Sequence, residues 1–227
     1  MWQRSQKSFD QLGEEYSLDK AARRHDYCRI YEKVFRDIRD QRVRFLELGI
    51  WEGCKSLPMW ESFFLPGSVI VGIDCMQDRV IEARERGYLA YCGNQEDEGF
   101  LRKVIAEAGP FDVIIDDCGH KWSDTVKSFE VLFCNGLRPR GFYAIEDLHC
   151  AYRYWERGKG ALYSTVSYLK MLVDNLNCHG EIEDKRDKLI KAKEDHFSAR
   201  FIKAISFYCN LCIIEKADHE WYEYSLW

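Results

Sequence analysis

The residues best suited to chemistry are two adjacent aspartates that follow an apolar run. In the segment FDVIIDDCGH, a buried strand is predicted directly before Asp116 and Asp117, and His120 follows three residues later. A second acidic pair, Glu146 and Asp147, ends another apolar run, FYAIED. Adjacent like charges repel, and burying them is costly unless something positive neutralises them. The pattern therefore predicts a cation beside these acids.

Magnesium is the cation that these donors favour. Clustered carboxylate oxygens, without a thiolate or an imidazole pair at ligand spacing, suit Mg²⁺ or a similar divalent ion. If the two strands are neighbours, we expect Asp117, Glu146 and Asp147 to converge on it. The ion could bind a substrate hydroxyl and lower its pKa, and His120 would then act as a general base. The plainer interpretation is that the acids are capping or turn residues and that His120 is structural.

The elements that position these residues alternate between strands and helices. Strands are predicted in VRFLELG, SVIVGID, YLAYC, FDVIIDD and RGFYAIED, with helical patterns between them. This alternation predicts an α/β, Rossmann-like fold with a mostly parallel sheet and helices on both faces. The later segment RFIKAISFYCNLCIIEK predicts a C-terminal antiparallel hairpin at the sheet edge.

The ends of the first two strands predict a nucleoside-binding site, because ligands of open parallel sheets bind beyond the carboxyl ends of the strands. The turn ELGIWEG supplies Glu47, Gly49 and Gly53, and Asp74 is placed for ribose hydroxyls. The turn lacks the dinucleotide Gly-x-Gly-x-x-Gly and the Lys-Ser/Thr of a phosphate loop, and its acidic neighbours disfavour a pyrophosphate. A cofactor with a nucleoside and a cationic end, such as S-adenosylmethionine, suits it better. The glycines alone would also fit a tight turn in any α/β protein.

Composition predicts one globular domain. With 227 residues, 46% of them hydrophobic, the chain can bury one substantial core. Its formal net charge of −5 gives no reason to expect a nucleic-acid partner. No stretch approaches the roughly 18–20 apolar residues of a membrane span, and the polar opening has no secretory core segment. We expect a cytoplasmic protein without a membrane partner, whose ten cysteines are reduced and whose CNLC run is structural.

Together, these motifs resemble those of the class I S-adenosylmethionine-dependent sugar O-methyltransferases of the macrocin, mycinamicin and novobiocin type. Proteins labelled cephalosporin hydroxylase are similar as well. The resemblance is carried by FLELGIWEG, VGIDC, GNQED, FDVIIDDCGH, GFYAIEDLHCAY and ISFYCNLCIIEK, with LDKAARRHDY upstream. It covers about residues 17–217 and implies the class I methyltransferase fold.

The resemblance implies a role for each residue at the strand ends. It implies Mg²⁺ held by Asp117, Glu146 and Asp147, with His120 as the base. The implied contacts to S-adenosylmethionine come from Glu47, Gly49 and Asp74, from Gln95 near the adenine and from Asp116 near the methionine end. The implied acceptor is a hydroxyl of a sugar, a glycosylated natural product or a polysaccharide, and relatives suggest a homo-oligomer.

We expect a single domain with four regions. These are an N-terminal helical cap (1–40), a cofactor-binding core (41–150), a helical lid (151–200) and closing strands (201–227). The N-terminal residues Asp19, Lys20, His25 and Tyr27 resemble a family segment that would cover the active site. For the charged stretch 181–196, a solvated helix is the plainer alternative to a lid or an oligomer contact.

The chain departs from the family pattern at several points. Cys118-Gly119 replaces Gly-Ser, Asn94 stands where the family often has Asp, and LHCAY replaces Leu-His-Thr-Ser-Tyr. One extra residue between Gly53 and Ser56 argues against a direct cofactor contact by Ser56. None of these changes removes a metal ligand or the base, so we expect an active enzyme.

Two other functional classes stay open. An iron-dependent hydroxylase would use His120 in a site of two histidines and one carboxylate. A second ligand histidine is missing, since His149 is expected to point away. A non-catalytic protein would bind the cofactor without turnover, which the intact acids and His120 disfavour.

Overall fold

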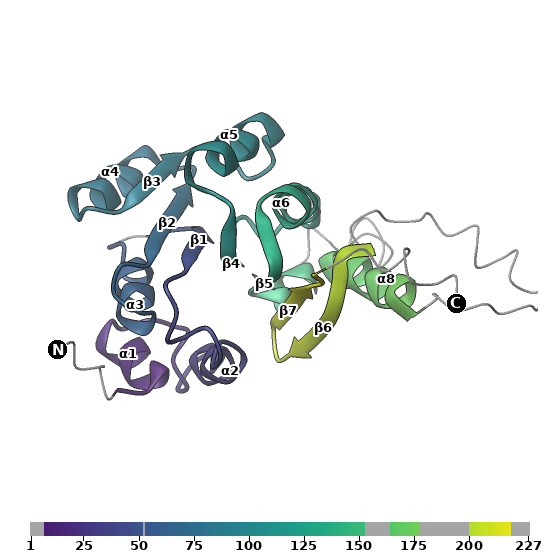
Figure 1. Ribbon diagram of the computed structural model, residues 1–227, viewed down its shortest axis with the longest axis horizontal. Coiled ribbons are helices and arrows are strands. Elements are labelled where there is room, and N and C mark those ends of the chain that lie inside the picture. The colour runs from purple at the N-terminus through teal and green to yellow at the C-terminus, as the bar shows by residue number, and fades with distance from the viewer. Residues whose placement is uncertain (1–6, 52, 153–163, 178–199, 219–227) are drawn as a thin grey trace, which may run out of the picture.

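In the part of the chain that the computed structural model describes, residues 7–51, 53–152, 164–177 and 200–218, seven strands form one sheet. The strands are β1 (Arg44–Leu48), β2 (Val69–Asp74), β3 (Leu89–Cys92), β4 (Phe111–Asp116), β5 (Leu137–Ile145), β6 (Ile202–Tyr208) and β7 (Leu211–Lys216). Their order is β3-β2-β1-β4-β5-β7-β6 (Figure 1). The first five strands pair in parallel, whereas β7 runs antiparallel to both β5 and β6. The predicted α/β architecture with a closing hairpin is confirmed.

Helices cover both faces of the sheet. They are α1 (Phe9–Glu15), α2 (Tyr27–Val34), α3 (Ser56–Phe63), α4 (Gln77–Glu85), α5 (Glu98–Ala108), α6 (Trp122–Asn135), α8 (Thr165–Asn177) and the 3₁₀ helix η1 (Leu148–Tyr152). Successive strand residues point to opposite sides, so Val113 and Ile115 face a core shared with α1 to α4, while Ile114 faces a core shared with α5, α6 and α8. None of the described helices is long and apolar enough to cross a bilayer.

The parallel register brings the acidic strand ends to one edge of the sheet. Asp116 at the end of β4 is paired with Ile145 at the end of β5, directly before Glu146. On its other side, Asp116 is paired with Leu48 at the end of β1. The chain leaves β1 toward β2 on one side, and β4 lies on the other side, so this is the point where strand order reverses. The predicted convergence of strand ends is therefore present in the fold.

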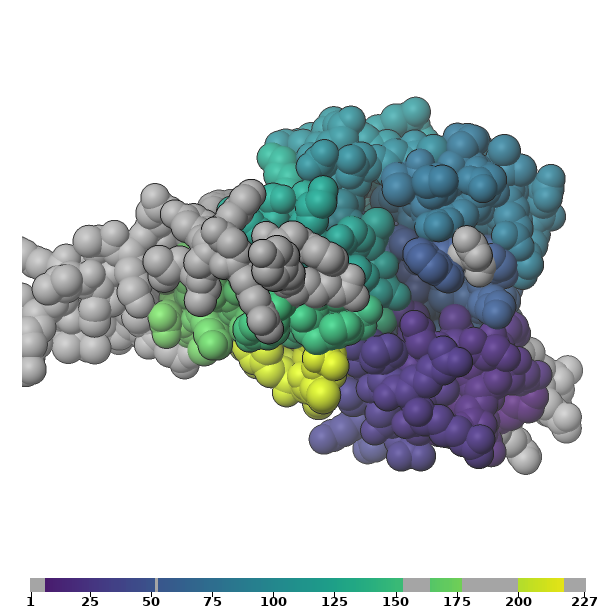
Figure 2. All heavy atoms as spheres, turned by 180° about the vertical axis from the view of Figure 1, so that it is seen from behind, coloured from purple at the N-terminus to yellow at the C-terminus, as the bar shows by residue number. Residues whose placement is uncertain are grey.

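The N-terminal helices pack beside the C-terminal hairpin. In the space-filling view, the purple N-terminal residues adjoin the yellow hairpin (Figure 2). The Tyr27 hydroxyl donates to the carbonyl of Asn210 in the hairpin turn at 3.2 Å. The rings of Phe35 and Phe142 lie 5.5 Å apart between centroids. The N-terminal helices thus contact both the hairpin turn and β5, which are far from them in sequence.

The four predicted regions correspond only partly to described residues. The helices α1 and α2 lie within 1–40, and β6 and β7 lie within 201–227. In the predicted lid, α8 is described, whereas the charged segment 181–196 lies outside the described residues. The division into cap, core, lid and closing strands therefore stays a prediction.

The described cysteines are unbridged, and the CNLC run is split between two environments. Cys209 is exposed in the hairpin turn, whereas Cys212 is buried on β7. Burial raises the pKa of the Cys212 thiol. The two sulfurs therefore lie in different surroundings, which disfavours a metal or redox site shared between them, and the structural role stays a prediction.

A buried lysine joins the hairpin to the end of α6. Lys216 on β7 is 7% exposed, and burial lowers its pKa. Its ammonium donates to the carbonyls of Phe133 (2.7 Å), Cys134 (3.1 Å) and Leu137 (2.8 Å). These carbonyls lie at and just beyond the last turn of α6, where intrahelical donors run out. The side chain of Lys216 thus caps the helix from a neighbouring strand.

Replacing Lys216 with Met is expected to lower the free energy of unfolding by about 1–3 kcal/mol, because two buried carbonyls and one partly buried carbonyl lose their donor. The matched change Lys203→Met breaks an exposed ion pair with Glu215 on the same hairpin. It should cost less than about 1 kcal/mol. Urea denaturation of both variants would measure the difference. Equal stability of the two variants would contradict the capping role.

Candidate active site

The ammonium of Lys20 lies among three carboxylates at the strand ends. Its Nζ is 2.6 Å from Asp117 Oδ2, 2.6 Å from Glu146 Oε2 and 3.8 Å from Glu47 Oε1. Lys20 is only 2% exposed. Burial alone would lower its pKa, but the three carboxylates outweigh burial and raise it well above its usual value. A lysine therefore supplies positive charge at the acids for which the sequence predicted a metal ion.

Backbone hydrogen bonds hold Lys20 in place. The segment between α1 and α2 folds back on itself, with His25 N donating to Asp19 O (3.0 Å) and Cys28 N donating to Lys20 O (2.9 Å). The N–H of Ala22 donates to the Asp10 carboxylate at 2.6 Å. The sequence pointed to this segment only through the family resemblance. A single lysine in a short loop has no periodicity that would predict burial.

Side-chain hydroxyl and indole groups donate hydrogen bonds to Glu146 and Glu47, the most deeply buried acids of this cluster. The hydroxyl of Tyr31 donates to Glu146 Oε1 at 2.7 Å. Burial raises the pKa of Glu146, although Lys20 opposes the shift. Glu47 accepts from the hydroxyl of Ser56 and from the indole of Trp60, and burial raises its pKa to about 7. Glu47 is fully buried, so these donors and Lys20 compensate a carboxyl group that solvent does not reach.

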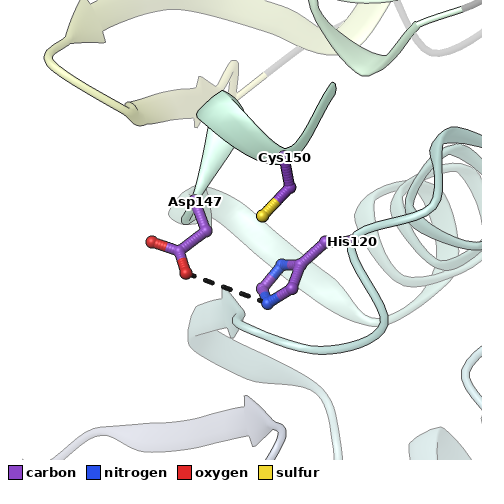
Figure 3. Close-up of side chains that lie close together, drawn as sticks. All are labelled: His120, Asp147 and Cys150. Atoms are coloured by element: carbon purple, nitrogen blue, oxygen red, sulfur yellow. Dashed lines mark ion pairs between the residues drawn. The ribbon is translucent and has the colours of Figure 1, made fainter. Parts of the chain in front are cut away.

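Asp117, Asp147 and His120 remain partly open. Their side chains are 24%, 21% and 26% exposed. His120 Nε2 lies 3.9 Å from Asp147 Oδ2, and the two side chains face each other (Figure 3). The hydroxyl of Tyr27 donates to the other oxygen of Asp147 at 3.0 Å. His120 and Asp147 both have left-handed backbone (φ 52° and 55°), so each sits in a tight turn that aims its side chain.

The three predicted metal ligands lie on one rim but do not enclose a single point. Lys20 bridges Asp117 and Glu146. Within the described residues, the donor atoms that gather within 4.8 Å of one another belong to His120, Asp147 and Cys150. The acids still suit a hard cation, because each carboxylate has about four lone-pair sites and a hydrogen bond does not use them all.

The expectation that His149 points away is wrong. Its Nδ1 lies 3.9 Å from Asp147 Oδ1, and its ring stacks on that of His25 at 6.2 Å between centroids. Asp147 therefore has a histidine near each of its two oxygens.

Asp74, the predicted ribose ligand, is 2% exposed and already has partners. It accepts from the N–H groups of Met76 (2.8 Å) and Trp51 (3.3 Å). Arg79 Nη1 lies 3.3 Å from it, and the Arg79 guanidinium stacks over the Trp51 ring at 4.6 Å. The sequence analysis did not single out Arg79, because an arginine on an exposed helix is common.

Three polar atoms at the rim are buried without a partner in the described structure. They are both amide atoms of Gln95 and Oδ1 of Asp116. Gln95 is 3% and Asp116 1% exposed. The other oxygen of Asp116 accepts from Ser128 (2.6 Å) and Tyr143 (2.9 Å), and burial raises its pKa to about 7. Unsatisfied buried groups are costly, so these atoms favour a polar ligand at this rim.

The glycine turn packs directly on the end of β4. Gly49 has φ 96°, and a Cβ there would collide with the carbonyl oxygen of Asp117. Gly53 has φ 77° and donates its N–H to Glu82 at 3.3 Å. Glycine is required at Gly49 by contact as well as by conformation, and at Gly53 by conformation alone.

A cavity of about 160 Å³ separates the glycine turn from the N-terminal segment. Its walls include cationic groups from Lys20, Arg24 and Lys55 and carboxylates from Glu47 and Asp117. Ser56 lines it too. Such a mixture of charges suits a zwitterionic ligand. Arg24 and Lys55 carried no motif signal in the sequence.

Sequence comparison finds sugar O-methyltransferases. Demethylmacrocin O-methyltransferase of Streptomyces fradiae is 34% identical over 221 residues, which are 91% of this chain and 52% of that protein. Mycinamicin VI 2''-O-methyltransferase of Micromonospora griseorubida is 33% identical over 224 residues, with 92% and 53% covered. This chain thus spans about half the length of these relatives. No family model matches it.

Comparison with solved structures gives the same group. The MycE methyltransferase of the mycinamycin biosynthetic pathway, in complex with Mg and SAH, superposes with a TM-score of 0.81 at 30% identity. The match covers 94% of this chain and 54% of that one. A complex that also contains mycinamycin VI has a TM-score of 0.77 at 29% identity. The expected methyltransferase fold and the resemblance to this family are confirmed.

Replacing Lys20 with Met is expected to destabilise the protein by about 3–5 kcal/mol, because the carboxyl groups of Asp117 and Glu146 would lose the buried cation that compensates them. Urea denaturation without divalent ions would measure this. Lys7→Met is the matched control, since the Lys7–Glu15 pair is as short (2.7 Å) but exposed. That change should cost less than about 1 kcal/mol. A Lys20→Met protein as stable as the control would show that the carboxylates do not depend on Lys20.

Proposed function

We propose that this chain, a relative of the macrocin- and mycinamicin-type sugar O-methyltransferases, transfers a methyl group from S-adenosylmethionine to a hydroxyl of a sugar, a glycosylated natural product or a polysaccharide. One observation carries the proposal. At a single rim, unpartnered buried atoms that suit a cofactor lie beside partly open acids and a histidine that suit an acceptor hydroxyl. The relatives named for sugar O-methylation support it.

The cofactor would be held along the ends of β1, β2 and β4. Gln95 would offer an amide donor and an acceptor to the adenine, and Asp74 at the end of β2 would accept from the ribose hydroxyls. The free oxygen of Asp116 would accept from the methionine ammonium. The cationic groups of the cavity beside Glu47 and the Gly49–Gly53 turn suit the methionine carboxylate. The SAH in the related structure supports this choice of cofactor.

The metal would be held by Asp117, Glu146 and Asp147, whose hard oxygens suit Mg²⁺. When bound, Mg²⁺ supplies positive charge that lowers the pKa of a coordinated hydroxyl. Lys20 already offsets part of the negative charge of Asp117 and Glu146, and Tyr27 and Tyr31 fix the orientations of Asp147 and Glu146. The related structure with Mg supports this assignment.

The histidine would act as the base. His120 takes the proton of the acceptor hydroxyl, while Asp147 beside its Nε2 stabilises the resulting positive charge. The acceptor oxygen attacks the methyl carbon in line. The O–C bond forms as the C–S bond breaks, the electron pair stays on sulfur, and S-adenosylhomocysteine leaves uncharged at sulfur. Positioning and fixed charges supply most of the acceleration.

An iron-dependent hydroxylase remains the second candidate, because His120 and His149 both lie near Asp147. The two histidines approach different oxygens of that carboxylate, which fits a shared iron less well. Iron binding with an absorption spectrum changed by His149→Gln would favour this candidate over a methyltransferase.

Replacing Gln95 with Ala is expected to weaken S-adenosylhomocysteine binding by about tenfold or more, because two hydrogen bonds to the ligand would be lost. Calorimetric titration would measure the affinity. Gln41→Ala removes an exposed glutamine amide and should leave the affinity unchanged. Unaltered affinity in Gln95→Ala would exclude Gln95 from the cofactor site.

Replacing His120 with Gln is expected to lower the rate of methyl transfer by roughly 10²–10⁴-fold, the usual contribution of a general base. Demethylmacrocin and mycinamicin VI would be the first acceptors tried, with the methyl-labelled cofactor and Mg²⁺. Cofactor affinity should stay within about twofold of the parent, since His120 acts on the acceptor. A full rate in His120→Gln would exclude it as the base. Binding without turnover on any hydroxylated acceptor would favour a non-catalytic protein.

A further inference from the structure

We propose that His120, Asp147 and Cys150 form a binding site for a soft divalent cation of the Zn²⁺ type, and that its occupation inhibits the enzyme. The inhibition rests on the proposed methyl-transfer function, whereas the binding does not. The site shares Asp147 with the expected magnesium site but differs from it in its sulfur and nitrogen donors.

The three donors come from two turns at the same end of the sheet. His120 follows β4, Asp147 follows β5, and Cys150 lies in η1. One donor atom from each residue lies within 4.8 Å of the other two. Figure 3 shows the imidazole, carboxylate and thiol gathered around one space, with one ring nitrogen of His120 facing the Asp147 carboxylate. No backbone rearrangement is needed to bring these residues together.

The distances between the three donor atoms would match those of a tetrahedral zinc site after small side-chain rotations. Zinc bonds of about 2.0–2.1 Å to nitrogen or oxygen and about 2.3 Å to sulfur place tetrahedral donors about 3.3–3.8 Å apart. His120 Nε2 and Asp147 Oδ2 are already 3.9 Å apart. The fourth position could be taken by water, as in three-ligand zinc sites, or by His149, whose Nε2 lies 3.7 Å from the Cys150 sulfur.

Neighbouring groups orient these donors as in established metal sites. The Tyr27 hydroxyl occupies Oδ1 of Asp147 and leaves Oδ2 toward His120. The N–H of Cys150 donates to the carbonyl of Asp147 at 2.8 Å, and Leu148 N donates to Asn210 O at 2.9 Å. These contacts fix the turn that carries the carboxylate and the thiol, and such outer partners strengthen metal binding.

The donor atoms of this site favour Zn²⁺, whereas those of the expected magnesium site favour Mg²⁺. A thiolate and an imidazole select zinc, whereas Mg²⁺ prefers oxygen and binds sulfur poorly. Cys150 is 1% exposed, while the side chains of His120 and Asp147 are 26% and 21% exposed, so an ion can approach from the rim. On binding, the thiol proton leaves to solvent as the sulfur–metal bond forms. The lone pair of His120 is then committed to the metal and cannot take a proton from the acceptor.

Cobalt titration of the metal-free full chain tests the site directly. Co²⁺ replaces Zn²⁺ as the probe, because a thiolate ligand gives a charge-transfer band in the near ultraviolet. The band is expected in the parent protein, lost in Cys150→Ser and retained in Cys209→Ser, an exposed cysteine of the hairpin turn. Cys150→Ala is the second variant, and a thermal melt of each variant reports folding. No band in the parent protein, or a band that persists without the Cys150 sulfur, would overturn the site.

Zinc inhibition tests the consequence. At saturating Mg²⁺, Zn²⁺ should suppress methyl transfer by the parent protein, and Cys150→Ser should need about tenfold more Zn²⁺ or higher for the same inhibition. Without added Zn²⁺, the two proteins should have the same rate, because Cys150 has no part in methyl transfer. Equal zinc sensitivity of both proteins would overturn the inhibitory role. If neither protein transfers methyl groups, the proposed function fails while the cobalt result still decides the site.

Discussion

The buried ammonium of Lys20 is the interaction on which the rest of the site depends. Three carboxylates at the ends of neighbouring strands would repel one another in a region that excludes water. Lys20 lies within 2.6 Å of Asp117 and Glu146, so it makes that burial tolerable. Because Lys20 belongs to the loop between α1 and α2, the same contact ties the N-terminal helices to the sheet. The side chain of Lys20 therefore both neutralises the acids and attaches these helices to the sheet.

Burial divides the acids into two kinds. Glu47 and Glu146 are almost wholly buried and hold hydroxyl, indole or ammonium donors. Asp117 and Asp147 keep about a fifth of their side-chain surface open. The buried acids form the polar base of the cluster, and the partly exposed ones face the rim. This division lets one cluster serve both stability and chemistry, since rigid support is what positions reactive groups.

The cofactor side of the rim differs from the acidic side in the hydrogen bonding of its buried polar groups. Each oxygen of Glu146 accepts a hydrogen bond within the protein, whereas Gln95 and one oxygen of Asp116 are buried and unpaired. Unpaired buried groups lower stability until a ligand satisfies them. Cofactor binding would therefore stabilise the fold, and the affinity would come partly from relieving that cost.

The sequence by itself determined the α/β class, the parallel strands with their closing hairpin and the acids at the strand ends. These features follow from local patterns: continuous apolar runs, turns after those runs, and acids directly after strands. Only the tertiary structure decided that Lys20 neutralises Asp117, which lies 97 positions away, and that His149 turns toward Asp147. It also brought the sulfur of Cys150 close to the imidazole of His120. Those contacts depend on how loops fold over the sheet edge, and lone side chains in loops have no periodicity from which their direction can be predicted.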